Sequence, residues 1–112
     1  KGLNTASLNY NYVYKGSDAL KPRVIFDNGI KTFFEFTGDV PSIFLVKEGG
    51  NESTVNSRRE GRFIVVDKLA HQFTLRAGEI ETCVFNMNVG AQAPDDVEAV
   101  YGPKKAGNGW FN

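Results

Sequence analysis

Hydrophobic and polar residues alternate with a period of two in several short segments, most clearly between residues 30 and 37. One face of this segment carries Ile30, Thr32, Phe34 and Phe36, and the other carries Lys31, Phe33, Glu35 and Thr37. This period predicts a half-buried β-strand. A second β-prone run precedes it, and Asn28-Gly29 between them tolerates the positive φ angles of a tight turn. We therefore expect a β-hairpin over residues 24–37 with a two-residue type I′ turn.

The same alternation recurs along the chain. In residues 8–14 it places four apolar or aromatic side chains on one face: Leu8, Tyr10, Tyr12 and Tyr14. Further strands, bounded by Gly, Pro, Asn or Asp, are expected over residues 42–46, 52–57, 62–67, 73–76 and 79–88. The run 52–57 is the most polar and is expected at a sheet edge. About eight or nine strands with no helical period predict an all-β protein, an antiparallel β-sandwich or barrel.

Changes in composition divide the chain. Residues 1–7 are small and polar, and we expect a mobile lead-in. Residues 8–89 contain the predicted strands and form the expected domain. Residues 90–112 hold four Gly, four Ala and two Pro, and we expect a flexible tail. The alternative is that its aromatic end, Trp110-Phe111, docks on a partner.

Length and charge restrict the function. The chain has 112 residues, the size of one domain, and its 13 basic residues balance 13 acidic ones. Proteins that bind nucleic acid usually carry a basic excess, which is absent. No apolar run reaches the length of about 20 residues that a membrane helix needs. The chain begins at Lys1 without a signal peptide pattern, so we expect it to come from a longer precursor.

The chemistry of an enzyme is not evident. His71 is the one imidazole and Cys83 the one thiol, so a structural zinc site is not expected. No Gly-x-Ser-x-Gly motif pairs a nucleophile with His71. Glu79 and Glu81 share a strand face, which a solvated surface explains most simply. We expect no catalytic residue, no metal and no cofactor.

Two features indicate binding instead. Tyr10, Tyr12 and Tyr14 form either the inner face of a strand or an exposed aromatic strip, of the kind found in interfaces. Cys83 is either a small buried hydrophobe or the source of an intermolecular disulfide. The expected partner-binding residues lie on these two strands: Leu8, Tyr10, Tyr12, Tyr14, Cys83, Phe85 and Met87.

Several motifs occur in an order and spacing typical of one known family. They are Tyr12-Val-Tyr-Lys-Gly16, the run Pro22–Phe33 with Asp27-Asn28-Gly29, Pro41–Phe44, Glu52 with Val55-Asn56, Phe63–Asp67, Phe73–Gly78 and Asn86. Over residues 10–88 the chain resembles the C-terminal domain of the TrbG/CagX family, the ninth VirB-type subunits of bacterial type IV secretion and conjugation machines. That family more often has Asp-Asp-Gly where this chain has Asp27-Asn28-Gly29.

The resemblance implies a β-sandwich located in the periplasm, in the core complex associated with the outer membrane. It also implies partners: a short lipoprotein (the seventh VirB-type subunit), the larger tenth VirB-type subunit, and further copies in a homo-oligomeric ring. The expected function is therefore structural, with the lipoprotein added along strand edges near residues 8–14 and 83–88. The alternative is a β-sandwich that binds carbohydrate or peptidoglycan on the tyrosine strip.

Overall fold

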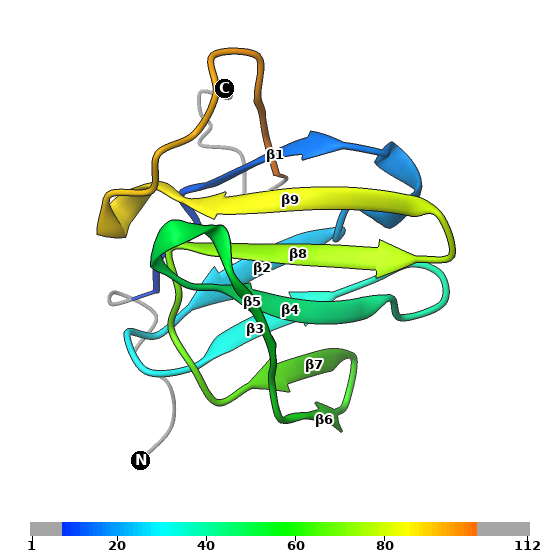
Figure 1. The fold of residues 1–112 in the computed structure, drawn as a ribbon. Helices are drawn as coiled ribbons and strands as arrows, with labels where there is room; N and C mark the ends of the chain where they lie inside the picture. The colour runs from blue at the N-terminus through cyan, green and yellow to red at the C-terminus, as the bar shows by residue number, and fades with distance from the viewer. Residues whose placement is uncertain (1–7, 101–112) are drawn as a thin grey trace, which may run out of the picture.

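The computed structural model of the protein describes residues 8–100, which form two antiparallel sheets packed face to face (Figure 1). The larger sheet has the order β10-β1-β9-β8-β4-β5. Its strands are β1 (Tyr12–Gly16), β4 (Ser42–Val46), β5 (Glu52–Thr54), β8 (Gln72–Ala77), β9 (Ile80–Asn86) and β10 (Glu98–Ala99). The smaller sheet has the order β2-β3-β7-β6, with β2 (Val24–Asp27), β3 (Thr32–Glu35), β6 (Ser57–Glu60) and β7 (Phe63–Val66). The expected antiparallel β-sandwich is confirmed.

The core lies between the sheets and follows from the alternation within each strand. Phe34 of β3 and Phe73 of β8 are both fully buried, and their rings meet edge to face at 5.3 Å between centroids. Burying an aliphatic or aromatic side chain of this kind stabilises the fold by about 1.5–3 kcal/mol. The same cluster contains the inward side chains Tyr12, Tyr14, Ile25, Ile64, Val66, Leu75, Val84 and Val100.

A second apolar cluster lies on the outer face of the smaller sheet. Phe26 and Phe33 stack at 4.9 Å between centroids, and Phe63 meets Phe26 edge on at 5.4 Å. Val65 is fully buried in this cluster, and Leu8 and Tyr10 pack against it. The smaller sheet is therefore apolar on both faces, which explains why Phe33 lies on the face opposite to Phe34.

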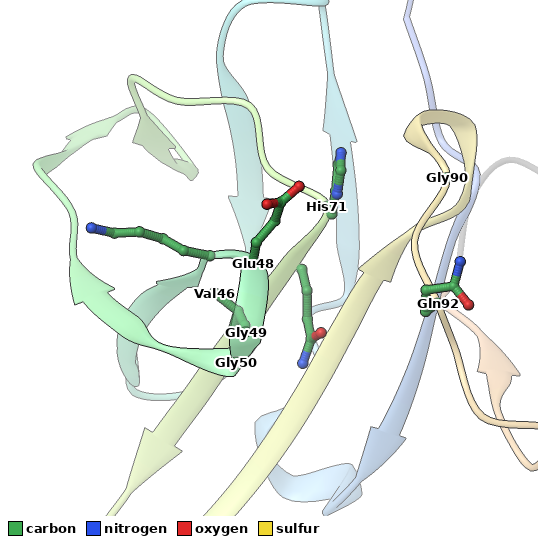
Figure 2. Close-up of a pocket in the computed structure, with 9 residues that line it drawn as sticks. Val46, Glu48, Gly49, Gly50, His71, Gly90 and Gln92 are labelled. Carbon is green, nitrogen blue, oxygen red and sulfur yellow. The ribbon is translucent and has the colours of Figure 1, made fainter.

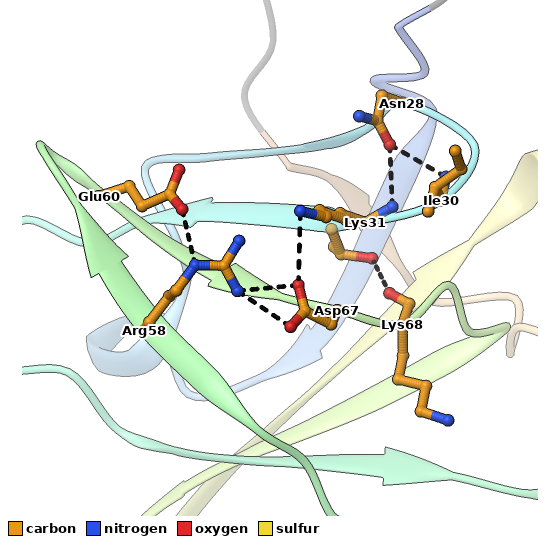
Figure 3. Close-up of polar contacts among 8 residues, drawn as sticks. Asn28, Ile30, Lys31, Arg58, Glu60, Asp67 and Lys68 are labelled. Carbon is orange, nitrogen blue, oxygen red and sulfur yellow. Dashed lines mark hydrogen bonds and ion pairs between the residues drawn. The ribbon is translucent and has the colours of Figure 1, made fainter.

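The β2–β3 hairpin is confirmed, but its predicted two-residue turn is wrong. Asp27 pairs with Thr32, so the loop contains four residues, 28–31. Asn28 Oδ1 accepts hydrogen bonds from the Ile30 and Lys31 amides at 3.0 and 2.8 Å, and this side-chain capping favours the wider loop (Figure 3). The register shifts by two residues, which preserves the faces of β3. Ile30 leaves the predicted face and is 69% exposed in the loop.

The polar run 52–57 is divided between the two sheets rather than forming the single strand we expected. β5 pairs with β4 in the larger sheet, and β6 pairs with β7 in the smaller one. The chain crosses between the sheets at Val55 and Asn56, and Val55 packs against the core there. Both strands lie at sheet edges, as expected for the polar run, and β6 exposes every side chain. Charged edges of this kind discourage pairing with other chains.

Residues 90–100 differ from the flexible tail that we expected there. β10 pairs with β1, and Val100 is only 3% exposed within the core between the sheets. The expected boundary at residue 89 is therefore too early, and the fold extends at least to Val100. Residues 1–7 of the expected lead-in and residues 101–112 of the expected tail, with Trp110 and Phe111, lie outside the described residues.

Candidate partner-binding surface

The three tyrosines expected to form one strip do not share one environment. Tyr12 and Tyr14 are 1% and 6% exposed and belong to the core between the sheets. Tyr10 precedes β1 and packs on the outer cluster, with its ring 5.2 Å from that of Phe26. Leu8 lies in the same outer cluster. The inner-face interpretation therefore holds for Tyr12 and Tyr14, and an exposed strip for stacking sugars is contradicted.

β1 is not the edge strand that we expected. It pairs with β9 along all five residues, from Tyr12↔Asn86 to Gly16↔Thr82. On its other side, within residues 8–100, it pairs with β10 at two positions, Val13↔Ala99 and Tyr14↔Glu98. The two residues of β10 carry no strand period, so the sequence does not predict this strand.

The other predicted residues lie on and beyond β9. Cys83 and Phe85 alternate with the inward Val84, so they project from the outer face of the larger sheet. Phe85 is nevertheless only 5% exposed, and Cys83 is half-buried. Met87 lies past the strand, in a short 3-10 helix (η4, Met87–Val89), and is 36% exposed. Met87 is therefore the most open of these three side chains, Cys83 is partly accessible, and Phe85 is closed to direct contact.

The Cys83 thiol is held in its protonated form. Burial raises its pKa, and the negative charge of Glu81 raises it further. Cys83 lies directly opposite Lys15 of β1 on one side and Thr74 of β8 on the other. Because the thiolate is the reactive species, a raised pKa lowers the reactivity of this thiol at neutral pH.

A buried polar network fixes the segment before β1, and sequence analysis gave no sign of it. Tyr12 Oη donates to Asp27 Oδ2 at 2.6 Å, and Asn86 Nδ2 donates to Tyr12 Oη at 3.0 Å. Asn9 Nδ2 lies 2.8 Å from Asp27 Oδ2 and 2.9 Å from Asn86 Oδ1. Burial and the Asp27 carboxylate raise the pKa of Tyr12 far above its usual range, so the phenol remains a donor. The network joins three segments of the chain.

The start of β1 is thus attached to both sheets. Asn9 exchanges backbone hydrogen bonds of 2.9 and 3.0 Å with Asp27, which belongs to β2 of the smaller sheet. The Met87 amide donates to the Asn11 carbonyl at 2.9 Å beside the larger sheet. These bonds fix the position of β1 in the fold. They also fix the register of its second edge, the one that faces β10.

The last residues that the structure describes are also held to β1. The Val100 amide donates to the Tyr12 carbonyl at 3.0 Å. Tyr14 Oη donates to Asp18 Oδ1 at 2.6 Å, and Glu98 Oε1 lies 3.1 Å from the same oxygen as a second acceptor. The Asp18 contact, burial and the Glu98 contact raise the pKa of Tyr14. Lys15 and Asp96 form an exposed ion pair at 2.9 Å.

Surface charges elsewhere pair with one another. Arg58 bridges Glu60 and Asp67 at 2.6 and 2.9 Å, and Lys31 lies 3.8 Å from Asp67 (Figure 3). The Arg58 guanidinium lowers the pKa of Asp67. On the larger sheet, Arg76 pairs with Glu52 and Glu81. Such exposed ion pairs are typical of a solvated surface. They agree with the expectation that Glu81 lies on a solvated face.

A shallow pocket of about 420 Å³ holds the one histidine. Its walls come from the turn between β4 and β5, from His71 and Gln72, and from the segment after η4 (Figure 2). Lys47, Glu48, His71 and Gln92 give it a polar lining. Across residues 8–100 no group of three His, Cys, Asp or Glu side chains is placed to hold a metal ion. No helix in this range is long and apolar enough to cross a membrane.

Comparison with known proteins identifies similar sequences. Residues 2–87 match the CagX family, described as conjugal transfer protein. Type IV secretion system protein virB9 of Bartonella quintana (strain Toulouse) is 39% identical over 85 residues, covering 74% of this chain and 29% of that protein. Protein virB9 of Agrobacterium tumefaciens (strain 15955) is 33% identical over 86 residues, covering 75% and 29%.

A conjugation protein is also similar. The probable conjugal transfer protein TrbG of Sinorhizobium fredii is 32% identical over 82 residues, which cover 69% of this chain and 30% of TrbG. The chain thus spans less than a third of the length of each of these three relatives.

Proposed function

Because the chain belongs to the CagX family of conjugal transfer proteins, we propose that it is a structural domain of a type IV secretion core complex associated with the outer membrane. It acts there by binding other subunits and catalyses no reaction. Its location is the periplasm. Its partners are a short lipoprotein, the larger tenth VirB-type subunit, and copies of itself in a ring.

The observation that carries the proposal is the side of β1 that faces β10. Five residues of β1 form a ladder with β9, while two pair with β10 in the part of the chain that the structure describes. An extended peptide gains affinity from backbone bonds to such an edge and specificity from side chains at alternate positions. The lipoprotein binds along this side of the sandwich, and Leu8, Tyr10 and Met87 lie just beyond the end of the ladder at Tyr12 and Asn86.

The burial of Tyr12 and Tyr14 changes the roles of the expected contact residues. Their rings support β1 from inside the core, so β1 offers the partner its backbone rather than its tyrosine rings. Cys83 and Phe85 likewise stiffen β9 from its outer face. The proposed partner contacts at side-chain level are then Leu8, Tyr10 and Met87, together with the partly exposed Cys83.

Cys83 also forms a disulfide with the lipoprotein, according to this proposal. Its raised pKa makes the reaction slow, which suits an oxidising compartment and a partner held in place beforehand. If Cys83→Ser leaves the pattern of assembled complexes on a non-reducing gel unchanged, no crosslink forms there.

Ring assembly strengthens individually weak contacts. A peptide that becomes ordered on binding loses part of its interaction energy, so we expect an isolated pair of moderate affinity. Many such contacts in one ring act together through high effective concentration.

Amide NMR spectra of the labelled chain test this function. The chain is titrated with a synthetic peptide of the mature lipoprotein from the same secretion system, and with peptidoglycan fragments as a control. Saturable shifts along residues 8–14 and 83–88 are the expected result. Shifts with the sugar and none with the peptide would favour the carbohydrate alternative. No shift with either in a folded sample would contradict peptide binding by this domain.

A further inference from the structure

β10 covers β1 as a short, self-supplied strand. Its pairing involves two residues, Glu98 and Ala99, and both side chains are exposed. An additional bond runs from the Val100 amide to the Tyr12 carbonyl. The alternation that defines a stable strand is absent, so side-chain packing on both faces does not hold β10 in place.

One side chain anchors this strand in the core. Val100 is 3% exposed and belongs to the same cluster as Tyr12, Tyr14 and Leu20. Glu98 adds an acceptor for Tyr14 Oη at 3.1 Å. The Lys15–Asp96 pair is exposed and contributes little, because water screens both charges. The anchor thus consists of an aliphatic residue and, two positions before it, a carboxylate.

Such an anchor is suited to exchange. Segments with few buried contacts open locally without unfolding the rest of a protein. β1 keeps its position when β10 leaves, because β9 and the network around Asp27 hold it from the other side. Opening would leave a backbone ladder beside an apolar slot vacated by Val100.

We propose that β10 is a placeholder which an extended partner peptide displaces from β1. The peptide runs antiparallel to β1, places an aliphatic side chain in the Val100 slot and an acidic side chain beside Tyr14 Oη. This rests on the proposed function, since the peptide is that of the lipoprotein. Residues 90–100 are released from β1 when it binds.

Locking β10 in place gives the sharpest test. Val13 and Ala99 are direct cross-strand partners, and antiparallel partners lie at a spacing that a disulfide spans. The full chain carries Val13→Cys and Ala99→Cys in a Cys83→Ser background. The control is the same protein after reduction, which differs only in the crosslink.

Two fluorescent peptides serve as probes. One is the synthetic lipoprotein peptide, and the other copies residues 94–101 of this chain. We expect oxidation of the lock to weaken binding of the lipoprotein peptide at least tenfold, and reduction to restore it. A lipoprotein peptide with Asp at the Val100 register is expected to lose at least tenfold in affinity.

Weakening the placeholder gives the opposite change. Val100→Asp disfavours the resting position of β10, so a larger fraction of the protein is open and apparent affinity rises with that fraction. The variant is expected to bind the lipoprotein peptide several-fold more tightly and to bind the copy peptide. The lock keeps the test valid if Val100→Asp does not fold.

The outcomes separate this inference from the proposed function. Equal binding of the lipoprotein peptide to oxidised and reduced lock overturns the displacement of β10 and leaves lipoprotein binding intact. If only the copy peptide binds, and only to unlocked forms, displacement stands and the lipoprotein is the wrong partner. If neither peptide binds any folded, unlocked form, both are overturned.

Discussion

The two ends of the described chain close the same side of the sandwich in different ways. The segment before β1 is held by backbone bonds to both sheets and by a buried network of Asn9, Asp27, Tyr12 and Asn86. The segment ending at Val100 is held by one buried side chain, a short ladder and exposed charges. Interlocked buried donors and acceptors are costly to separate, whereas a single anchor opens readily. The comparison indicates a fixed segment beside an exchangeable one.

Removing the centre of the network has the largest expected effect. Asp27→Ala leaves Tyr12 Oη, Asn9 and Asn86 without their shared acceptor inside the protein. We expect a loss of about 3 kcal/mol in the free energy of unfolding, measured by urea denaturation. The matched control is Asp18→Ala, which removes an acceptor of Tyr14 Oη that is more exposed than Asp27. This variant is expected to lose about 1 kcal/mol in the free energy of unfolding. Equal losses would contradict a special role for the network.

The ladder between β1 and β9 is tested at the end of β1. Gly16 has φ of 127°, and an added Cβ would lie 2.5 Å from the Glu81 carbonyl oxygen. Gly16→Ala is therefore expected to lose about 2 kcal/mol or more in thermal or urea unfolding. Gly61→Ala is the control, because Gly61 has φ of 63° and no atom lies within 4 Å of its added Cβ. Gly61→Ala is expected to lose about 1 kcal/mol in the free energy of unfolding. A smaller loss for Gly16→Ala would mean that β1 shifts to make room for the added Cβ.

Hydrogen exchange compares the two ends directly. The Asn9 amide bonds to the Asp27 carbonyl at 2.9 Å, and the Val100 amide bonds to the Tyr12 carbonyl at 3.0 Å. Although the bonds are alike, we expect the Val100 amide to open at a free energy lower by about 2 kcal/mol. Similar protection at both amides would remove the distinction between fixed and exchangeable ends.

The smallest effect is expected at the exposed pair near β10. The Lys15 ammonium lowers the pKa of Asp96, so its stabilisation is present above the unfolded pKa and is lost as pH falls through the folded pKa. Lys15→Gln is expected to leave the urea midpoint unchanged within error at neutral pH. Any faster exchange at the Val100 amide should disappear in acid, where Asp96 is protonated in both proteins. A difference that persists in acid would assign another role to Lys15.

The sequence predicted the parts of the fold that local alternation controls. The faces of β3 were correct despite the wrong turn, because the register moved by an even number of residues. The edge position of the polar run was also correct. Its division between two sheets was missed, because the crossing at Val55 and Asn56 depends on which sheet each half can join.

The candidate site was harder to predict, since its geometry depends on contacts between distant residues. Tyr10 and Tyr12 share a face in an extended chain, but Asn9 bonds to the smaller sheet and Tyr10 turns to the outer cluster. β10 follows residues 90–97, which show no alternation of apolar and polar positions, and its buried apolar anchor is Val100. No local pattern shows that Asp27 accepts from Tyr12.

The place of β1 between β9 and β10 has a consequence for the order of folding. Its network bond to Asn86 spans 74 residues, and its bond to Glu98 spans 84. Contacts so distant in sequence form late and slowly, because the intervening loop must close first. While the chain is being synthesised or exported, β1 has neither neighbour until β9 emerges. During that interval Tyr12 and Tyr14 lack the core neighbours that bury them in the folded protein.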